Sequence, residues 1–190
     1  MERPASYYDE TYESSSVHSW RDYRSVRQRL YKAATGMIES GTPLVIDLGC
    51  GPGHFAEYLH EFLPGRGIEL LSYWGFDFSP VAIRKAQNIG LPGHFKFEAQ
   101  DLLQMEFPLI SPDAAFVLME VLEHIEYDMD VLDLIPAGCT CIVSVPEFDD
   151  PAHVRTFPHW GAVADRYGDR IDIKEMRRIW KWHLFKGVKK

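Results

Sequence analysis

Hydrophobic residues gather in five short runs along the chain, and each run shows little alternation of apolar and polar positions. Near-continuous hydrophobicity is typical of strands that are buried on both faces of a parallel sheet. The predicted strands are Leu44–Leu48, Leu70–Phe76, Phe95–Glu98, Ala114–Met119 and Cys141–Val145. Their centres lie 20 to 27 residues apart, which is the length of a strand followed by a crossover connection.

Helix-compatible segments separate these runs. They are Phe55–Phe62, Pro80–Asn88, a short connection near Leu102–Met105, and Val121–Leu134, with His159–Tyr167 after the fifth strand. Upstream, apolar residues at helical spacing predict an amphipathic helix over Trp20–Ser40. Near the C-terminus, Arg170–Trp180 and Trp182–Val188 fit two antiparallel edge strands. The pattern predicts an α/β fold with a doubly wound, mostly parallel seven-stranded sheet and helices on both faces.

The length and composition suit one folded unit. The chain has 190 residues, of which 46% are hydrophobic and 25% are charged, so it can bury enough apolar surface to offset its ordering entropy. We therefore expect a single domain over residues 1–190, with an N-terminal arm and helix at 1–40 and the sheet core at 41–190.

The formal net charge is −8, because 28 acidic residues outnumber 20 lysines and arginines. A net-acidic chain lacks the diffuse positive field that attracts phosphate backbones, so nucleic acid is not the expected partner. A local basic patch stays possible near the C-terminus. Its residues would be Lys174, Arg177, Arg178, Lys181, Lys186, Lys189 and Lys190.

Cysteine usage and hydropathy bear on the compartment. Cys50, Cys139 and Cys141 cannot all pair within one chain, and a lone Cys-x-Cys lacks the second ligand pair of a zinc site. No stretch approaches the roughly 18 apolar residues that a membrane-spanning helix needs. We therefore expect reduced thiols, no membrane span and a cytoplasmic protein.

A glycine-rich loop follows the first predicted strand, in the run Asp47-Leu48-Gly49-Cys50-Gly51-Pro52-Gly53-His54. Alternate glycines allow a sharp turn and a close approach of the backbone to a ligand at the carboxyl end of the strand. The dinucleotide fingerprint requires a sixth-position glycine, where this chain has His54, so NAD is disfavoured. A phosphate-binding P-loop is excluded because no Gly-Lys-Ser/Thr follows. Asp47 would repel a phosphate but suits an ammonium group.

In these residues the sequence resembles the class I S-adenosylmethionine-dependent methyltransferases, which have a Rossmann-like fold. Their first motif is an acidic residue, any residue and then Gly-x-Gly-x-Gly. The resemblance covers roughly residues 40–150 and includes Phe76-Asp77-Phe78-Ser79, Gln100-Asp101-Leu102 and Ala115–Glu120 in the family's order. It implies S-adenosyl-L-methionine as cofactor and S-adenosyl-L-homocysteine as product. The implied cofactor-binding residues are Asp47, Gly49, Cys50, Gly51, Gly53, Asp77, Phe78, Asp101, Leu102, Met119 and Glu120.

Each motif also has a purely structural interpretation. The glycine loop by itself is a tight turn. Ser79 and Pro80 fit the N-cap and first position of a helix, so part of the signal at Asp77 is structural. Asp101 is equally explained as a solvated loop carboxylate.

The expected chemistry requires alignment more than covalent catalysis. The cofactor already carries an activated methyl group, so the protein must align the acceptor and exclude water. A base is needed only for a hydroxyl or a protonated amine, and His124 and His153 are the candidates. We predict a small-molecule acceptor that is methylated on oxygen or nitrogen.

Four residues also compose a possible metal site. A helix beginning at Glu120 would place Glu120, Glu123 and His124 on one face, and His153 is the natural fourth ligand. The stretch is similar to those of quinone-biosynthesis O-methyltransferases and small-RNA 3′-end methyltransferases, some of which bind a metal through two Glu and two His. Alternatively, the carboxylates stabilise a helix N-terminus and His124 packs on the sheet. We expect no bound metal.

The resemblance implies that the N-terminal arm forms a lid and that the loop after the fifth strand lines the acceptor pocket. Candidate substrate residues are Tyr8, Tyr12, His153, Arg155 and Trp160. Two alternatives remain open. One is a metal-assisted methyltransferase acting on a catechol-like or RNA-terminal hydroxyl, and the other is a non-catalytic, cofactor-binding partner subunit.

Overall fold

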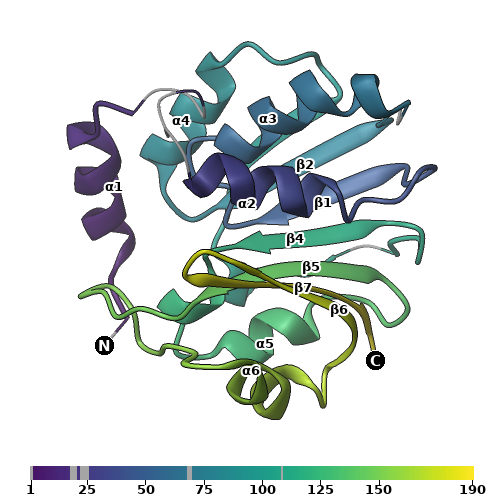
Figure 1. The fold of residues 1–190 in the computed structure, drawn as a ribbon. Coiled ribbons are helices and arrows are strands. Elements are labelled where there is room, and N and C mark those ends of the chain that lie inside the picture. The colour runs from purple at the N-terminus through teal and green to yellow at the C-terminus, as the bar shows by residue number, and fades with distance from the viewer. Residues whose placement is uncertain (1, 18–20, 22–25, 68–69, 108) are drawn as a thin grey trace.

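The computed structural model describes residues 2–17, 21, 26–67, 70–107 and 109–190 (Figure 1). Seven strands form one sheet in the order β3-β2-β1-β4-β5-β7-β6. They are β1 (Leu44–Leu48), β2 (Ser72–Asp77), β3 (Phe95–Ala99), β4 (Ala115–Met119), β5 (Thr140–Pro146), β6 (Ile171–Ile179) and β7 (Trp182–Lys189). The first five strands are parallel, and β7 pairs antiparallel with both β5 and β6. The predicted sheet is therefore confirmed.

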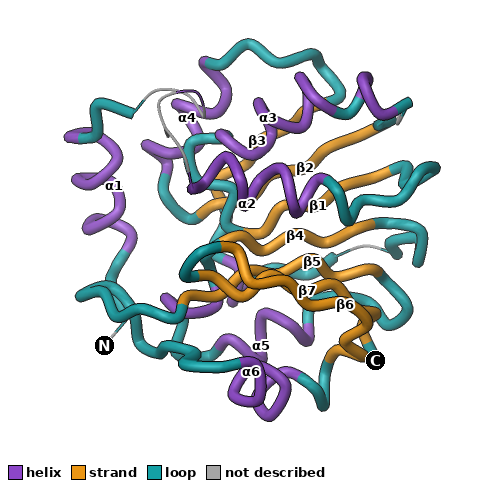
Figure 2. The backbone as a smooth tube through the Cα atoms, in the orientation of Figure 1, coloured by secondary structure: helices purple, strands orange, loops and turns teal. Residues whose placement is uncertain are grey.

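Within the described part of the chain, six α-helices accompany the sheet (Figures 1 and 2). They are α1 (Ala5–Ser14), α2 (Val26–Thr35), α3 (His54–Phe62), α4 (Pro80–Asn88), α5 (Asp128–Asp133) and α6 (Trp160–Tyr167). Short 3-10 turns lie at Pro64–Arg66, Leu102–Gln104 and Leu122–His124. Among the described residues, no helix is long and apolar enough to cross a membrane.

Two apolar clusters sandwich the sheet. In β1, Val45 packs in a cluster with Leu30 of α2 and Leu59 of α3. Its neighbour Ile46 packs in the opposite cluster with Leu132 of α5 and other residues of α5 and α6. Successive strand side chains point to opposite faces, so both faces of β1 are apolar because both are covered. This explains the near-continuous hydrophobicity of the central runs.

The segment predicted as one helix over Val121–Leu134 is instead a 3-10 turn, a loop and the short α5. The prediction of a continuous helix is wrong because the turn's carbonyl groups have other partners. The guanidinium of Arg155 donates to the carbonyl oxygens of Leu122, Ile125 and Glu126. Carbonyls bound in this way are not paired with the N–H groups of a following helical turn.

The N-terminal part also departs from the prediction. The expected helix over Trp20–Ser40 is observed as α2, which ends at Thr35, while residues 20 and 22–25 lie outside the described residues. The arm that precedes α2 contains an additional helix, α1, which the sequence pattern does not indicate. None of the α1 residues is buried, so the amphipathic signal used for the other helices is weak here.

The basic residues near the C-terminus do not form an unneutralised patch. Arg178 pairs with Glu147, and Arg177 pairs with Glu175, each at 2.5 Å. The further pairs are Lys174 with Asp172, Lys186 with Glu39, and Lys189 with Asp133. Such pairing cancels most of the local field that phosphate-backbone binding requires.

Candidate functional site

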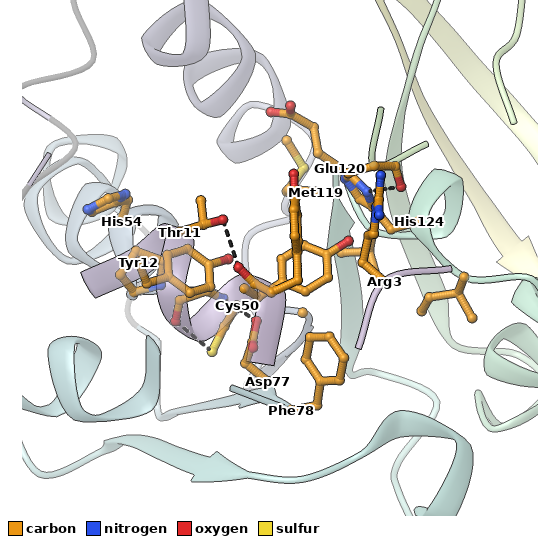
Figure 3. A pocket seen from close by; sticks show the side chains of 18 of the residues that line it. Arg3, Thr11, Tyr12, Cys50, His54, Asp77, Phe78, Met119, Glu120 and His124 are labelled. Atoms are coloured by element: carbon orange, nitrogen blue, oxygen red, sulfur yellow. Dashed lines mark hydrogen bonds between the residues drawn. The ribbon is translucent and has the colours of Figure 1, made fainter. Parts of the chain in front are cut away.

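A cavity of about 460 Å³ opens at the carboxyl ends of β1, β2 and β4, next to α1. Its lining includes most residues predicted to bind cofactor or acceptor. They are Tyr8, Tyr12, Asp47, Gly49, Cys50, Gly51, Asp77, Phe78, Asp101, Leu102, Met119, Glu120, His124 and His153. Figure 3 shows Tyr12 and Cys50 on one side of this pocket, and Arg3 and His124 on the other. Gly53, Glu123, Arg155 and Trp160 are not among the described lining residues.

The glycine loop turns sharply between β1 and α3. Gly51 has a φ of 53°, and a Cβ atom there would lie 3.2 Å from the Tyr12 hydroxyl on α1. Gly53 has a φ of 81°, and a Cβ atom there would lie 2.9 Å from the Cβ of Ala86 on α4. Both positions therefore favour glycine, but for different reasons. Gly51 keeps the pocket open, whereas Gly53, predicted as a cofactor residue, allows close packing beside α4.

Asp47 is the penultimate residue of β1 and carries a buried carboxylate; the residue is 1% exposed. One oxygen accepts a hydrogen bond from the Tyr73 hydroxyl, and the other, Oδ1, has no partner among the described residues. Burial raises the pKa of Asp47 from 3.8 to about 7, although the Tyr73 bond acts in the opposite direction. An unpartnered carboxylate oxygen on the wall of a cavity is a ready partner for a cationic group.

Asp77 ends β2 and joins two loops. Its Oδ2 accepts from the backbone N–H of Gly51, and its Oδ1 accepts from the N–H of Ser79, each at 2.9 Å. Burial raises the pKa of Asp77 to about 6 despite these two hydrogen bonds. Ser79 caps α4, because its hydroxyl accepts from the N–H of Ala82 at 3.0 Å. The capping role and a ligand-facing carboxylate thus coexist in this motif.

Asp101 follows β3 and begins the 3-10 turn at Leu102–Gln104. Its Oδ1 accepts from the N–H of Leu103 at 3.0 Å, and its Oδ2 accepts from the Gln104 side chain at 2.9 Å. The carboxylate therefore stabilises the turn while it contributes to the pocket lining. Both interpretations of Asp101 from the sequence remain compatible with its position.

The helix α1 lies across the pocket and is attached by polar contacts. Asp9 accepts from the Ser79 hydroxyl at 2.5 Å and from the N–H of Val81 at 3.4 Å. Further along, the Lys85 ammonium donates to the carbonyl oxygen of Tyr12. The helix brings Tyr8 against Phe78, with ring centroids 5.2 Å apart. Residues that precede the first strand therefore form part of the pocket wall.

Tyr8 also reaches the other end of the pocket. Its ring lies 5.9 Å from that of His124, and its hydroxyl is buried without a hydrogen-bond partner among the described residues. Burial, with a contribution from Tyr7, raises the pKa of the Tyr8 hydroxyl above its usual value of 10. The hydroxyl is therefore a neutral donor that a bound molecule could satisfy.

The two candidate base histidines face each other, with ring centroids 4.9 Å apart. Nδ1 of His124 lies 3.1 Å from the carbonyl oxygen of Ala152, and Nδ1 of His153 lies 3.2 Å from that of Phe148. A carbonyl oxygen only accepts, so each neutral ring carries its proton on Nδ1 and has a lone pair on Nε2. Burial lowers the pKa of His124, which keeps its lone pair available at neutral pH.

Three of the four residues in the alternative metal set come together. One atom each from Glu123, His124 and His153 lies within 4.8 Å of the others. Glu123 is fully buried, both of its carboxylate oxygens lack a described partner, and burial followed by nearby Glu120 raises its pKa well above 4.5. Glu120 does not join this group, because its φ of 60° places it outside the 3-10 turn. The predicted sharing of one helix face by Glu120, Glu123 and His124 is therefore wrong.

Glu120 instead lines the pocket beside Arg27 of α2. The nearest side-chain N–O distance between them is 3.3 Å. Burial raises the pKa of Glu120, while Arg27 acts in the opposite direction. The backbone N–H of Glu120 donates to the Ser144 hydroxyl at 3.0 Å. This hydrogen bond holds Glu120, whose backbone is in the left-handed conformation, against β5.

Two residues predicted for the acceptor lie outside the pocket. Arg155 is used within the protein, where it holds three carbonyl groups of the 122–126 segment and pairs with buried Asp128 at 3.1 Å. Trp160 begins α6 and packs on His183, with ring centroids 4.1 Å apart. The prediction that Arg155 and Trp160 line the acceptor pocket is therefore not supported by their positions.

The sequence analysis missed several lining residues. They are Glu2, Arg3, Tyr7, Thr11, Arg27, Tyr31, His54, Phe55, Lys85 and Phe148, among others. Six of the ten lie before the first strand, in α1, in α2 or in the two residues Glu2 and Arg3, where no motif marks them. The family resemblance alone indicates this arm, because it implies that the N-terminal residues form a lid over the cofactor.

Comparison with known proteins connects this geometry to one group of enzymes. A family model described as a methyltransferase domain matches residues 45–135. Trans-aconitate 2-methyltransferase from Methylobacterium nodulans is 32% identical over 114 residues, which are 57% of this chain and 41% of that protein. Its namesake from Mycobacterium tuberculosis is 31% identical over 110 residues, 57% of this chain and 40% of that protein. The chain thus spans about two fifths of the length of these relatives.

Solved structures share the fold at low sequence identity. The N-methyltransferase NodS from Bradyrhizobium japonicum, in complex with S-adenosyl-L-homocysteine, has a TM-score of 0.75 at 15% identity and covers 98% of this chain and 99% of its own. Magnesium protoporphyrin IX methyltransferase from Synechocystis, with bound S-adenosylmethionine, has a TM-score of 0.64 at 18% identity. The match covers 90% of this chain and 83% of that one. Both therefore share the overall fold of this chain.

Proposed function

Because the chain belongs to the class I S-adenosylmethionine-dependent methyltransferases, we propose that it transfers a methyl group from S-adenosyl-L-methionine to an oxygen or nitrogen atom of a small molecule. The names of its relatives support an acceptor of this size, since trans-aconitate and protoporphyrin are small molecules. The neutralised basic residues near the C-terminus and the net charge of −8 favour a small molecule over nucleic acid.

The observation that carries the proposal is the unpartnered oxygen of Asp47. A buried carboxylate without a full set of partners is costly unless a ligand completes it. The cofactor's α-ammonium group supplies that partner, and the adjacent Gly51 leaves room for it beside the backbone. The Asp47 carboxylate suits an ammonium group and not a phosphate, because a negatively charged Asp47 would repel an anion.

In the same proposal, Asp77 and Asp101 bind the ribose and adenine parts of the cofactor. Each carboxylate oxygen has a second lone pair, so Asp77 can accept from ribose hydroxyls while it keeps the hydrogen bonds from Gly51 and Ser79. We assign Asp101 and Leu102, which both line the pocket, to the adenine end. Phe78 and Tyr8 provide aromatic surface between the two carboxylates and the histidines.

The cofactor supplies a methyl group that is activated by a positively charged sulfur. The chain orients the acceptor, excludes water and accepts a proton. When the acceptor is a hydroxyl or an ammonium, Nε2 of His124 or His153 takes the proton that it loses, since Nδ1 of each ring is held by a carbonyl oxygen. Met119 and Glu120 form the wall between the two ends of the pocket.

We place this reaction in the cytoplasm, and we treat residues 1–190 as one catalytic unit. All three cysteines are free, and all three are buried, which suits a reducing compartment. The absence of a metal requirement stays a prediction.

The decisive test is binding followed by turnover. Calorimetric titration of the purified chain with S-adenosyl-L-homocysteine should show a single site. Gly51→Val should abolish it, because a β-branched residue is strained at the φ of 53° and would take up space on the pocket wall beside the Tyr12 hydroxyl. A screen of small acceptors with methyl-labelled S-adenosylmethionine then measures transfer. Unaltered affinity in Gly51→Val, or an affinity that is absent from the start, would contradict the proposed site.

A further inference from the structure

The tip of the β6–β7 hairpin carries a strained aromatic residue. Ile179 pairs with Trp182 across the hairpin, which leaves Trp180 and Lys181 as a two-residue turn. Trp180 has a φ of 58°, at a turn position where glycine is the usual residue. Its side chain is 57% exposed. A bulky residue in the left-handed region is an outlier, and such strain concentrates at functional positions.

A row of ring contacts connects this tip to the pocket. The rings of Trp180 and Trp182 are 5.5 Å apart, and those of Trp182 and Phe148 are also 5.5 Å apart. Phe148 lines the pocket, and its ring lies 5.5 Å from that of His153. The hairpin tip lies at the same end of the sheet as α1 (Figure 1). Trp180 is therefore linked to this end of the cavity by packed rings, with the buried Trp182 between Trp180 and Phe148.

The neighbouring residue adds a positive charge. The Lys181 ammonium lies 5.2 Å from the centre of the Trp180 ring. Other cations of the hairpin are paired with carboxylates, including Arg178 with Glu147 and Arg177 with Glu175. Within the described ranges, Lys181 forms no such ion pair. The tip thus presents an exposed aromatic face beside an unneutralised ammonium.

We propose that Trp180 and Lys181 form an acceptor subsite outside the cavity, which binds a planar aromatic group bearing a carboxylate. This inference rests on the proposed methyltransferase function, since the subsite would hold the distal part of an acceptor whose reacting atom enters the pocket. The indole stacks on the aromatic plane, and the ammonium pairs with the carboxylate. A glycine at position 180 would give the same turn without strain, so the tryptophan is explained by its side chain and not by the hairpin.

The test uses three probes of matched shape or charge: 2-naphthoate, 2-naphthol and cyclohexanecarboxylate. Each is titrated into the full chain with and without S-adenosyl-L-homocysteine, and binding is measured by calorimetry and by the indole signals in NMR spectra. We expect 2-naphthoate to bind most tightly. Trp180→Gly should weaken its binding at least tenfold, and Lys181→Gln should reduce it to the level of 2-naphthol without changing 2-naphthol itself.

The variants are designed to separate the subsite from stability. Trp180→Gly keeps the turn because glycine adopts a positive φ freely, so its unfolding temperature should not fall. Leu71→Gly is the control, since it removes another exposed apolar side chain far from the hairpin tip. Leu71 is 67% exposed and lies just before the first residue of β2. Equal 2-naphthoate affinity in the wild type and Trp180→Gly, or an equal loss in Leu71→Gly, would overturn the subsite. Failure of the wild type to bind S-adenosyl-L-homocysteine would instead contradict the proposed function.

Discussion

Oδ2 of Asp77 accepts a 2.9 Å hydrogen bond from the backbone N–H of Gly51, and this bond ties the glycine loop to the end of the neighbouring strand. The carboxylate belongs to β2, whereas the glycine follows β1. One side chain therefore sets the shape of the loop and also lines the cavity. Loop geometry and ligand binding should respond together when it is changed.

Asp77→Ala is the first prediction. We expect the binding free energy of S-adenosyl-L-homocysteine to weaken by about 1.5–3 kcal/mol, the range for hydrogen bonds to a charged group. The loss should be smaller for an analogue that lacks both ribose hydroxyls, as measured by calorimetry. Ser79→Ala is the matched control, because it should cost about 1 kcal/mol of stability through the lost cap of α4 and leave the preference for ribose intact. Equal losses for both ligands would assign Asp77 a structural role only.

Asp47→Asn separates the ammonium contact from the rest of the cofactor. We expect S-adenosyl-L-homocysteine to bind roughly tenfold to a hundredfold more weakly, since charge-assisted bonds contribute about 1.5–3 kcal/mol. Binding of 5′-methylthioadenosine, which has no amino acid part, should not change. The apo variant should unfold at the same temperature or higher, because a buried carboxylate oxygen without a partner is removed. A parallel loss of 5′-methylthioadenosine affinity would contradict the assignment.

The pH dependence follows from the same residue. Burial raises the pKa of Asp47 in the folded chain from 3.8 to about 7, so the folded state holds a proton that the unfolded state has lost between these values. The contribution of Asp47 to stability is therefore present below about pH 4 and is lost as the pH rises to about 7. Relative to Asp47→Asn, the free energy of unfolding of the apo wild type should fall across this window, as measured by urea denaturation.

Affinity for S-adenosyl-L-homocysteine should rise, whereas the stability of the apo protein falls, as the pH increases toward about 7. Pairing with an ammonium requires the charged form of Asp47, so S-adenosyl-L-homocysteine should bind more weakly as the pH falls below about 7. Calorimetry in buffers of different ionisation enthalpy should detect a released proton near pH 6.5. A wild type and an Asp47→Asn variant with identical pH profiles would contradict this linkage.

The strands could be predicted because each central strand is covered on both faces, which leaves a continuous apolar run in the sequence. The pocket residues at the ends of β1, β2 and β4 are predicted mainly by the family resemblance. Their positions agree with the general rule that parallel strands place their carboxyl ends at one edge of the sheet. Helix α1 left no such signal. It is held by polar contacts between residues about seventy positions apart, such as Asp9 with Ser79, and no local pattern contains them.

The break after β4 was also beyond local reasoning. The run from Val121 to Leu134 has helical spacing, yet Arg155, roughly thirty residues later, captures three of its carbonyl groups. This tertiary contact overrides local propensity. The same contacts use the charge of Arg155 within the protein, whereas the sequence analysis predicts that Arg155 faces the acceptor.

Arg155→Met is the last prediction and tests this clamp. The Arg155 side chain is 16% exposed, and that of its partner Asp128 is 1% exposed. The substitution therefore leaves a buried carboxylate whose remaining partners among the described residues are Arg166 and Tyr167. Breaking a buried pair typically costs about 3–5 kcal/mol, and Arg166 should reduce this to about 2–3 kcal/mol. Chemical denaturation measures the change.

Arg170→Met provides the matched control, because its pair with Asp133 joins side chains that are 41% and 46% exposed. Exposed pairs contribute about 0–1 kcal/mol, so this variant should stay close to the wild type. Since Arg155 holds the turn that carries His124, Arg155→Met should also slow methyl transfer while leaving S-adenosyl-L-homocysteine affinity within about twofold. Equal stability losses in the two variants would contradict the role of Arg155 as a clamp and would mean that another contact breaks the helix after β4.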